Sequence, residues 1–181
     1  MIKAENPQQV IRLLRSLRAV RQFRQEPIPQ EVIDALLEVA RWTGTASNSQ
    51  HWELVVIREK KTLQALAQCE GFAHHLAGAA LGMVLVMSGE PGLAEQETYD
   101  EGRLSERLML AAEAYGVGSC IGWLKGKGRT DAKALLGIPQ ERLVRTTISF
   151  GYPDEEALRA RPKRTDARKP LSELVHFERY S

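Results

Sequence analysis

The chain has 181 residues, of which 43% are hydrophobic and 27% are charged, and a formal net charge of +2. This length suffices for one domain with a substantial core, so we expect a single domain over residues 1–181. So small a net charge does not favour nucleic acid as the main partner. The two cysteines and four histidines show no metal-ligand spacing, so the sequence predicts no metal site.

Helices and strands alternate through the first half of the chain. Asn6 followed by Pro7 predicts the start of a first helix, because proline is tolerated at the first helical position. A second helix is expected to end by Gly44. A buried strand follows over residues 53–58, then a short helix, then a second strand over residues 81–87. The apolar positions that mark the three helices are Val10, Ile11, Leu13, Leu14 and Leu17; Ile33, Leu36, Leu37 and Ala40; and Leu63, Leu66 and Ala67.

The second half contains the longest expected helix. Asp100 is predicted to cap this helix and Gly116 to end it. Further strands are expected over residues 119–124 and 143–150, with a short helix between them that begins at Thr130 or Asp131. A charged, irregular segment is expected up to Lys169, and a last short helix from Pro170. This order of elements predicts one α+β domain.

No membrane or secretory signal is recognisable. The longest apolar stretch, residues 76–87, is too short to span a bilayer and is interrupted by two glycines. The N-terminal residues lack the apolar core of a signal peptide. We therefore expect a cytoplasmic protein that does not associate with membranes.

Basic residues from both ends of the chain could form an anion site. Arg18 and Arg21 lie where the first helix gives way to a loop, and Arg168 and Lys169 lie near the C-terminus. A guanidinium offers a planar set of donors that fits a phosphate group. In a chain with 25 lysines and arginines, solvated surface charge is the simpler explanation for any one of them.

Four segments of the chain together resemble the nitroreductase family. The resemblance covers nearly the whole chain and implies an α+β fold with a mainly antiparallel sheet flanked by helices. It also implies a homodimer that binds flavin mononucleotide (FMN) at the dimer interface. The segments are Arg18-Ala19-Val20-Arg21-Gln22-Phe23, Asn48-Ser49-Gln50-His51-Trp52, Gly116 to Trp123, and Arg168-Lys169-Pro170-Leu171.

The resemblance also implies roles for individual residues. The first segment is expected to contact the phosphate, ribityl chain and pyrimidine edge of FMN, although Leu17 and Ala19 replace the arginine and serine common in the family. The second segment is expected to reach the flavin of the partner subunit, the third to donate backbone N–H groups to flavin N5, and the fourth to bind the phosphate. The cofactor-binding residues predicted in this way are Arg18, Ala19, Arg21, Asn48, Gln50, Ile121, Gly122, Arg168 and Lys169.

The function implied by the resemblance is FMN-dependent oxidoreduction. NADH or NADPH would reduce the flavin, which would then reduce a nitroaromatic, a quinone or a similar small acceptor in a ping-pong cycle. No catalytic side chain is predicted, because the cofactor carries the chemistry. Two alternatives stay open: another flavoenzyme on the same fold, such as a dehydrogenase or dehalogenase, and a non-catalytic flavin-binding module.

Two other features suggest weaker hypotheses. Gly116 and Gly118 superficially resemble a dinucleotide-binding motif, but they follow a helix and lead into a strand, which is the reverse of the order such a motif requires. Of the adjacent pair His74 and His75, at least one could approach the flavin pocket, although a histidine satisfied at a helix end is the simpler interpretation.

Overall fold

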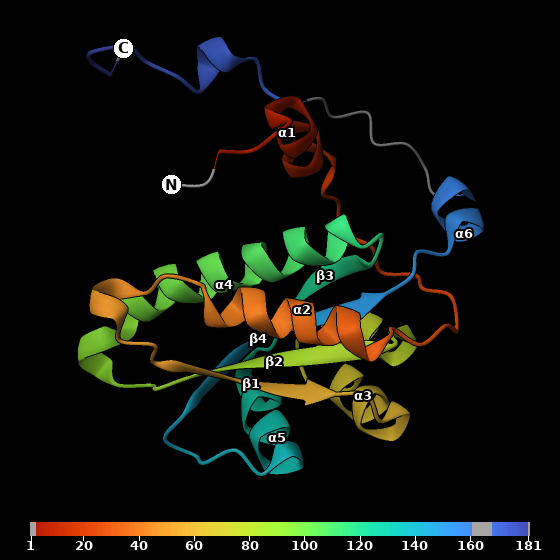
Figure 1. Cartoon of the computed structure of the whole chain (residues 1–181). Helices are drawn as coiled ribbons and strands as arrows, with labels where there is room; N and C mark the ends of the chain where they lie inside the picture. Colours follow the sequence, from red (N-terminus) through yellow and green to blue (C-terminus); the bar gives the residue numbers. More distant parts are fainter. Residues whose placement is uncertain (1–2, 161–167, 181) are drawn as a thin grey trace.

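A four-stranded antiparallel sheet forms the centre of the molecule (Figure 1). The computed structural model describes residues 3–160 and 168–180. Its strands are β1 (Trp52–Ile57), β2 (Leu81–Met87), β3 (Gly118–Trp123) and β4 (Leu143–Gly151), and they pair in the order β1-β2-β4-β3. The prediction of an antiparallel sheet in an α+β fold is therefore confirmed.

Helices cover both faces of this sheet. Helices α2 (Gln30–Arg41) and α4 (Ala94–Ala114) pack on one face, and α3 (Lys60–Ala67) and α5 (Gly126–Leu136) on the other (Figure 1). Central strand β2 is buried along its whole length, because alternate side chains point to opposite faces of a strand. Leu81, Met83 and Leu85 join the core beneath α2 and α4, whereas Val84 and Val86 join the core beneath α3 and α5.

The chain between α1 (Pro7–Ser16) and α2 lies beside the outer strand β3. Val20 N donates to Ser119 O at 2.8 Å, and Ala19 forms an isolated parallel bridge with Ser119. A Cβ atom added to Gly118 would lie 2.8 Å from Val20 Cβ, closer than real Cβ contacts allow. Glycine is therefore required at position 118 to let residues 18–21 approach the strand.

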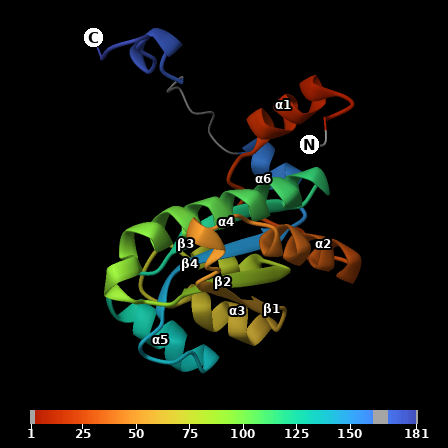
Figure 2. The same cartoon turned by 60° about the vertical axis from the view of Figure 1, so that its left-hand side comes forward.

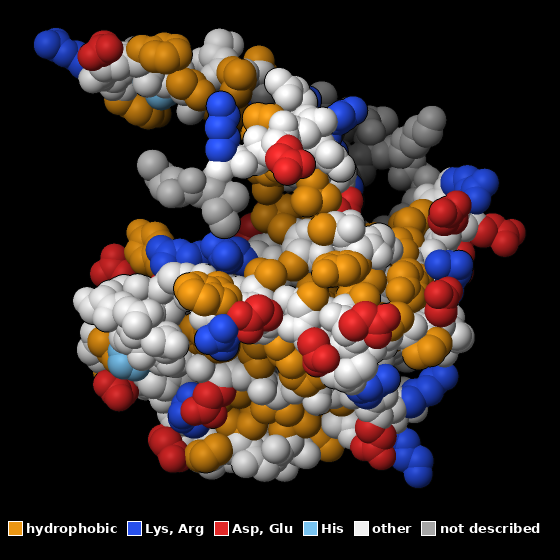
Figure 3. All heavy atoms as spheres, viewed as in Figure 1, with side chains coloured by type: hydrophobic (Ala, Val, Ile, Leu, Met, Phe, Trp, Pro, Cys, Tyr) orange, Lys and Arg blue, Asp and Glu red, His pale blue; other side chains and the backbone are white. Residues whose placement is uncertain are grey.

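Helix α1 and the C-terminal segment stand away from the body of the molecule (Figure 2). Asn6 caps α1 by accepting from Gln9 N at 3.0 Å, and Pro7 is its first residue, as predicted. The apolar residues of α1 do not pack into the core: Ile11 is 52% exposed, and no residue of the helix is buried. Figure 3 shows hydrophobic side chains at the surface in both regions.

Shorter helices complete the described structure. The α-helix α6 (Glu155–Ala160) follows β4. The 3-10 helices are η1 (Ala46–Asn48), η2 (His74–Gly78), η3 (Pro91–Leu93) and η4 (Leu171–Glu173). Among the described residues, no helix is long and apolar enough to cross a membrane.

Several predicted boundaries were wrong. Helix α4 begins at Ala94, so Asp100 lies inside the helix and is buried rather than acting as its cap. Helix α5 begins at Gly126, before Thr130. Helix α6 occupies part of the segment predicted to be irregular. Strand β1 lies at an edge of the sheet, and most of its residues are only partly buried.

Candidate cofactor-binding site

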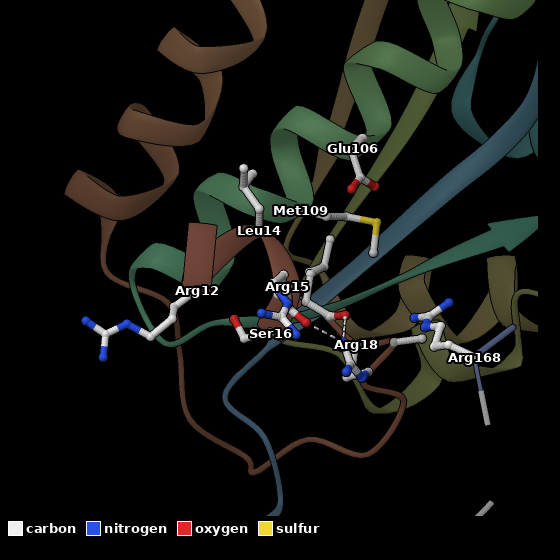
Figure 4. A pocket seen from close by; sticks show the side chains of 10 residues that line it. Arg12, Leu14, Arg15, Ser16, Arg18, Glu106, Met109 and Arg168 are labelled. Atoms are coloured by element: carbon white, nitrogen blue, oxygen red, sulfur yellow. Dashed lines mark hydrogen bonds between the residues drawn. The ribbon is translucent and has the colours of Figure 1, made fainter. Parts of the chain in front are cut away.

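A cluster of arginines lines a cavity of about 940 Å³ between the C-terminal end of α1 and helix α4 (Figure 4). Arg15, Arg18 and Arg168 lie side by side in this cavity, whereas Arg12 points away from the other three. The cluster joins the two ends of the chain, as the resemblance predicts for Arg18 and Arg168. We call this region the arginine cavity.

The arginine cavity has an excess of positive charge. Among the residues that the structure describes, its lining contains four arginines and one carboxylate, Glu106. The guanidinium of Arg18 is held by the carbonyls of Arg15 and Leu17, at 2.7 and 2.8 Å, and forms no ion pair with a carboxylate of the described chain. An anion with several acceptor oxygens, such as a phosphate monoester, matches such donors in charge and geometry.

A second cavity of about 600 Å³ lies further along the same segment of chain. It is lined by Arg21 and Gln22 from the segment, by Phe72, His74 and His75 near η2, and by Ile121 of β3. We call it the ring cavity, because the rings of Phe72, His74 and His75 form part of its lining. Residues 18–21 connect the two cavities, and three extended residues span roughly 10 Å.

His75 is the buried titratable group of the ring cavity. Its Nδ1 lies 2.6 Å from Ser149 Oγ, and its Nε2 is buried with no hydrogen-bond partner among the described residues. Burial, followed by the nearby charge of Arg21, lowers the pKa of His75 to about 4. The imidazole is therefore neutral at physiological pH and can offer a donor or an acceptor without adding charge.

Five of the nine predicted residues line one of the two cavities, and the other four line neither. Arg18, Ala19 and Arg168 line the arginine cavity, and Arg21 and Ile121 line the ring cavity. Lys169 lines neither described cavity, is exposed, and has its Nζ 3.9 Å from a carboxylate oxygen of Glu173. The remaining three are Asn48, Gln50 and Gly122.

Asn48 and Gln50 lie at the opposite end of the sheet from Ala19. They precede Trp52, which pairs with Met87, whereas Ala19 bridges to Ser119 near the Gly118 end of β3. Both side chains are exposed, and Gln50 Nε2 donates to Asn48 O at 3.1 Å. Within one chain, the structure does not bring these two residues to either cavity.

Gly122 faces the interior of the protein. A Cβ atom at this position would lie 2.5 Å from Thr147 Oγ1 and 3.1 Å from Ala73 Cβ. The packing of η2 and β4 against β3 thus leaves no room for a side chain at position 122. The prediction that its backbone contacts a flavin is not tested by this packing.

Arg12, Arg15 and Phe72 were not predicted as site residues. Arg12, Arg15 and Arg18 are spaced by three residues, which places them on one side of a helix and its end. That spacing is visible in the sequence and could have identified the cluster. Phe72 carries no such signal, because it reaches the ring cavity through a loop whose path depends on the fold.

Comparisons with known proteins agree with this architecture. The family model described as "Nitroreductase family" matches residues 14–82. The chain is 27% identical over 155 residues to an Archaeoglobus fulgidus protein named "Putative NADH dehydrogenase/NAD(P)H nitroreductase", covering 82% of this chain and 88% of that protein.

Solved structures share the fold. An FMN-dependent nitroreductase of Clostridium difficile R20291 superposes with a TM-score of 0.77 at 22% identity, covering 94% of this chain and 99% of that one. A Desulfovibrio desulfuricans protein solved in complex with FMN gives a TM-score of 0.76 at 23% identity, covering 98% and 100%.

The three-layer arrangement and its two cavities define a protein of the nitroreductase fold. The matching family model and the relatives show that the chain is similar to members of the nitroreductase family.

Proposed function

We propose that the protein is an FMN-dependent oxidoreductase that takes reducing equivalents from NADH or NADPH. The observation that carries the proposal is the placement of Arg15, Arg18 and Arg168 in one cavity, joined through residues 18–21 to the ring cavity. An elongated ligand with a phosphate at one end and a ring system at the other fits this arrangement.

The residues present suit the phosphate end of FMN. A phosphate monoester carries a charge of about −1.5 to −2 at neutral pH. The arginines of the cavity form no ion pair with a carboxylate of the described residues, so their charge is available to such a group. Arg18 is also pinned by two backbone carbonyls, so its donors are oriented before a ligand arrives. Such preorganisation reduces the entropy that binding would otherwise cost.

The ring cavity suits the flavin end. When bound, FMN would accept hydride from the nicotinamide and pass the electrons to an acceptor. Arg21 would place a positive charge at the pyrimidine edge, and backbone N–H groups of β3 near Ile121 would donate to the ring. His75, neutral and fixed by Ser149, would form part of the inner wall.

The acceptor that we propose is a nitroaromatic, a quinone or a similar small molecule, reduced in a ping-pong cycle. The proposal assigns no side chain as general acid: solvent would supply the protons that accompany the electrons, and the cofactor would carry the hydride. Asn48, Gln50, Gly122 and Lys169 are proposed to complete the site, the first two from the partner subunit of a homodimer.

The visible absorption spectrum of the purified protein tests the function. We expect flavin bands that bleach when NADPH or NADH is added without oxygen and that return when a nitroaromatic or quinone is added. Bands that persist with both donors would indicate a flavin-binding module. A colourless protein that cannot be reconstituted with FMN would contradict the proposal.

A further inference from the structure

Three large apolar side chains form an exposed strip beside the ring cavity. Ile121 and Trp123 alternate with buried residues on β3 and are 41% and 40% exposed. Phe72 is 61% exposed and lies next to this strand, because its N–H donates to Trp123 O at 2.7 Å. So much exposed apolar and aromatic surface in one place is typical of a binding surface.

Cations border this aromatic strip. The Lys125 ammonium lies 4.3 Å from the centroid of the Phe72 ring. The guanidinium carbons of Arg129 and Arg145 lie 6.0 and 5.9 Å from the centroid of the Trp123 ring. The strip therefore combines flat apolar surface with a basic margin.

Two of these cations have charge available for a ligand. Arg145 is already paired with the buried carboxylate of Glu101. Lys125 and Arg129 form no ion pair with any carboxylate in the described part of the chain, and Arg129 uses only its Nε to donate to Leu124 O at 3.0 Å. Two uncompensated positive charges thus face the strip, and they complement a group that carries nearly two negative charges.

The strip continues directly from the ring cavity. Ile121 and Phe72 line that cavity and also begin the strip. Trp123 lies about 7 Å further along β3 than Ile121, because a strand rises about 3.4 Å per residue. A ligand with one end over the ring cavity could therefore place a second ring on Trp123 or Phe72 and an anion at Lys125 and Arg129.

We propose that Phe72, Trp123, Lys125 and Arg129 form the docking surface for the adenosine end of the nucleotide donor, and that the two cations select NADPH through its 2′-phosphate. This assignment rests on the proposed function, since it requires the nicotinamide to reach a flavin in the ring cavity. Aromatic side chains stack on purine bases, because every base presents a flat π-face. A phosphate dianion beside them pairs with ammonium and guanidinium groups.

The first test uses nucleotide fragments that contain no nicotinamide. Binding of 2′,5′-ADP and of 5′-AMP to the purified protein is measured by calorimetry and by quenching of tryptophan fluorescence. We expect 2′,5′-ADP to bind at least tenfold more tightly than 5′-AMP, since one charge-assisted contact contributes about that factor. In a Lys125→Ala/Arg129→Ala variant, this preference should disappear.

Lys127→Ala is the matched control. The substitution removes one positive charge from helix α5, which also contains Arg129, but Lys127 Nζ is paired with Asp131 at 2.5 Å and is not among the cations beside the rings of the strip. This variant should keep the preference for 2′,5′-ADP. Loss of the preference in Lys127→Ala as well would show a general charge effect and overturn the assignment.

The second test is the ratio of kcat/KM for NADPH to that for NADH. It should fall about tenfold or more in the Lys125→Ala/Arg129→Ala variant. Equal binding of 2′,5′-ADP and 5′-AMP to the unaltered protein would overturn the proposal even if FMN is bound and reduced. Tight binding of 4-nitrobenzoate without that preference would also overturn it and assign the strip to an anionic acceptor.

The outcomes separate this proposal from the proposed function. A protein that cannot bind FMN but prefers 2′,5′-ADP would refute the flavin assignment and leave the nucleotide surface in place. A flavoprotein that NADH and NADPH reduce equally well, with no fragment preference, would refute the nucleotide surface alone.

Discussion

Single residues set the charge and the shape of the two cavities. Arg18 and Arg168 come from opposite ends of the chain, yet they line one cavity with Arg15. The sequence predicted the first two because their motifs resemble those of the family. It could not predict that Arg12 points away while Arg15 points inward, since side-chain direction follows from how α1 packs.

We expect Arg18→Ala and Arg168→Ala each to weaken FMN binding by roughly 10- to 100-fold, the equivalent of one lost charge-assisted contact. The dissociation constant can be measured by fluorescence titration of the flavin-free protein. Arg24→Ala is the control, because Arg24 pairs with Glu26 on the surface and lines neither cavity. Unchanged affinity in both test variants would refute the phosphate assignment.

His75 should make the stability of the protein depend on pH. Its pKa is lowered to about 4 in the folded state, so between pH 6.5 and 4 the unfolded chain binds more protons than the folded one. The free energy of unfolding is therefore not reduced by His75 above pH 6.5. As the pH falls toward 4, it declines, and the contribution of His75 to this decline is no more than about 3 kcal/mol. Arg21 and His74 are the charged or titratable neighbours that act on it.

Urea unfolding at pH 7 and pH 5 tests this dependence. The unaltered protein should lose more stability over this interval than His75→Gln, whatever the stability of the variant at pH 7. Parallel declines in the two proteins would show that His75 is not the group responsible.

Gly118→Ala should destabilise the protein, because its new Cβ would lie within 3 Å of three side-chain atoms of Val20. Overpacking of this kind costs about 1–3 kcal/mol and should displace residues 18–21, weakening FMN binding as well. Gly102→Ala is the contrasting variant, since nothing lies within 4 Å of its Cβ and the site is helical. It should be stabilising by roughly 0.5–1 kcal/mol, so a thermal melt should shift in opposite directions for the two.

At the scale of elements, the sequence predicted the helices and strands that a periodic pattern of apolar residues marks. It missed the helix boundaries that depend on polar contacts. Strand β2 was predicted with its observed bounds, because its apolar run is buried on both faces. The start of α4 was wrong because its first turns carry acidic residues instead of an apolar stripe. Those acids are buried through long-range contacts: Glu97 accepts from Ser88 N at 2.7 Å, and Asp100 lies 3.4 Å from Ala46 N.

The start of α5 was missed for a related reason. Glycine disfavours a helix interior, so Gly126 and Gly128 give no local helix signal. In the structure, the Glu70 carboxylate accepts from Lys127 N at 2.9 Å, and a Cβ at position 128 would collide with the backbone of Glu70. A contact between residues more than fifty positions apart thus holds the first turn, and no local pattern reveals it.

The ion pair between Glu101 of α4 and Arg145 of β4 joins a helix to the sheet. Both side chains are largely buried, with 5% and 16% exposed. Removing one partner leaves a buried charge without compensation, so Arg145→Met should lower the free energy of unfolding by about 3–5 kcal/mol. The double variant Arg145→Met/Glu101→Leu should recover much of that loss, which a double-mutant cycle of urea unfolding can measure. A double variant as unstable as the sum of both single variants would show that the pair is not coupled.

At the scale of the whole molecule, two regions of the described chain expose large apolar side chains. Helix α1 exposes Val10, Ile11 and Leu14, and the C-terminal segment exposes further large apolar residues, including Leu171 and Phe177. The apolar period of α1 correctly predicted a helix, but no residue of this helix is buried within one chain. The same is true of Asn48 and Gln50, which lie far from the cavities of their own chain. Both observations support the proposal of a homodimer.

We expect the protein to elute as a dimer, and Val10→Glu/Ile11→Glu, which leaves the lining of the arginine cavity unchanged, to shift it to a monomer, because charges on an apolar interface oppose burial. The mass is measured by light scattering coupled to size-exclusion chromatography. Leu135→Glu is the control: Leu135 is 43% exposed, as is Val10, but lies on α5 on the far side of the sheet. This control should remain a dimer.

The affinity for FMN tests whether the flavin site depends on the dimer. If Asn48 and Gln50 reach the cofactor of the partner subunit, the monomeric variant should bind FMN more weakly than the dimer, and Asn48→Ala/Gln50→Ala should weaken binding without changing the mass. The two exposed side chains contribute little to stability within one chain, so an effect of their removal on FMN affinity must act through the partner. A monomer that retains full affinity would instead confine the flavin site to the arginine and ring cavities of a single chain.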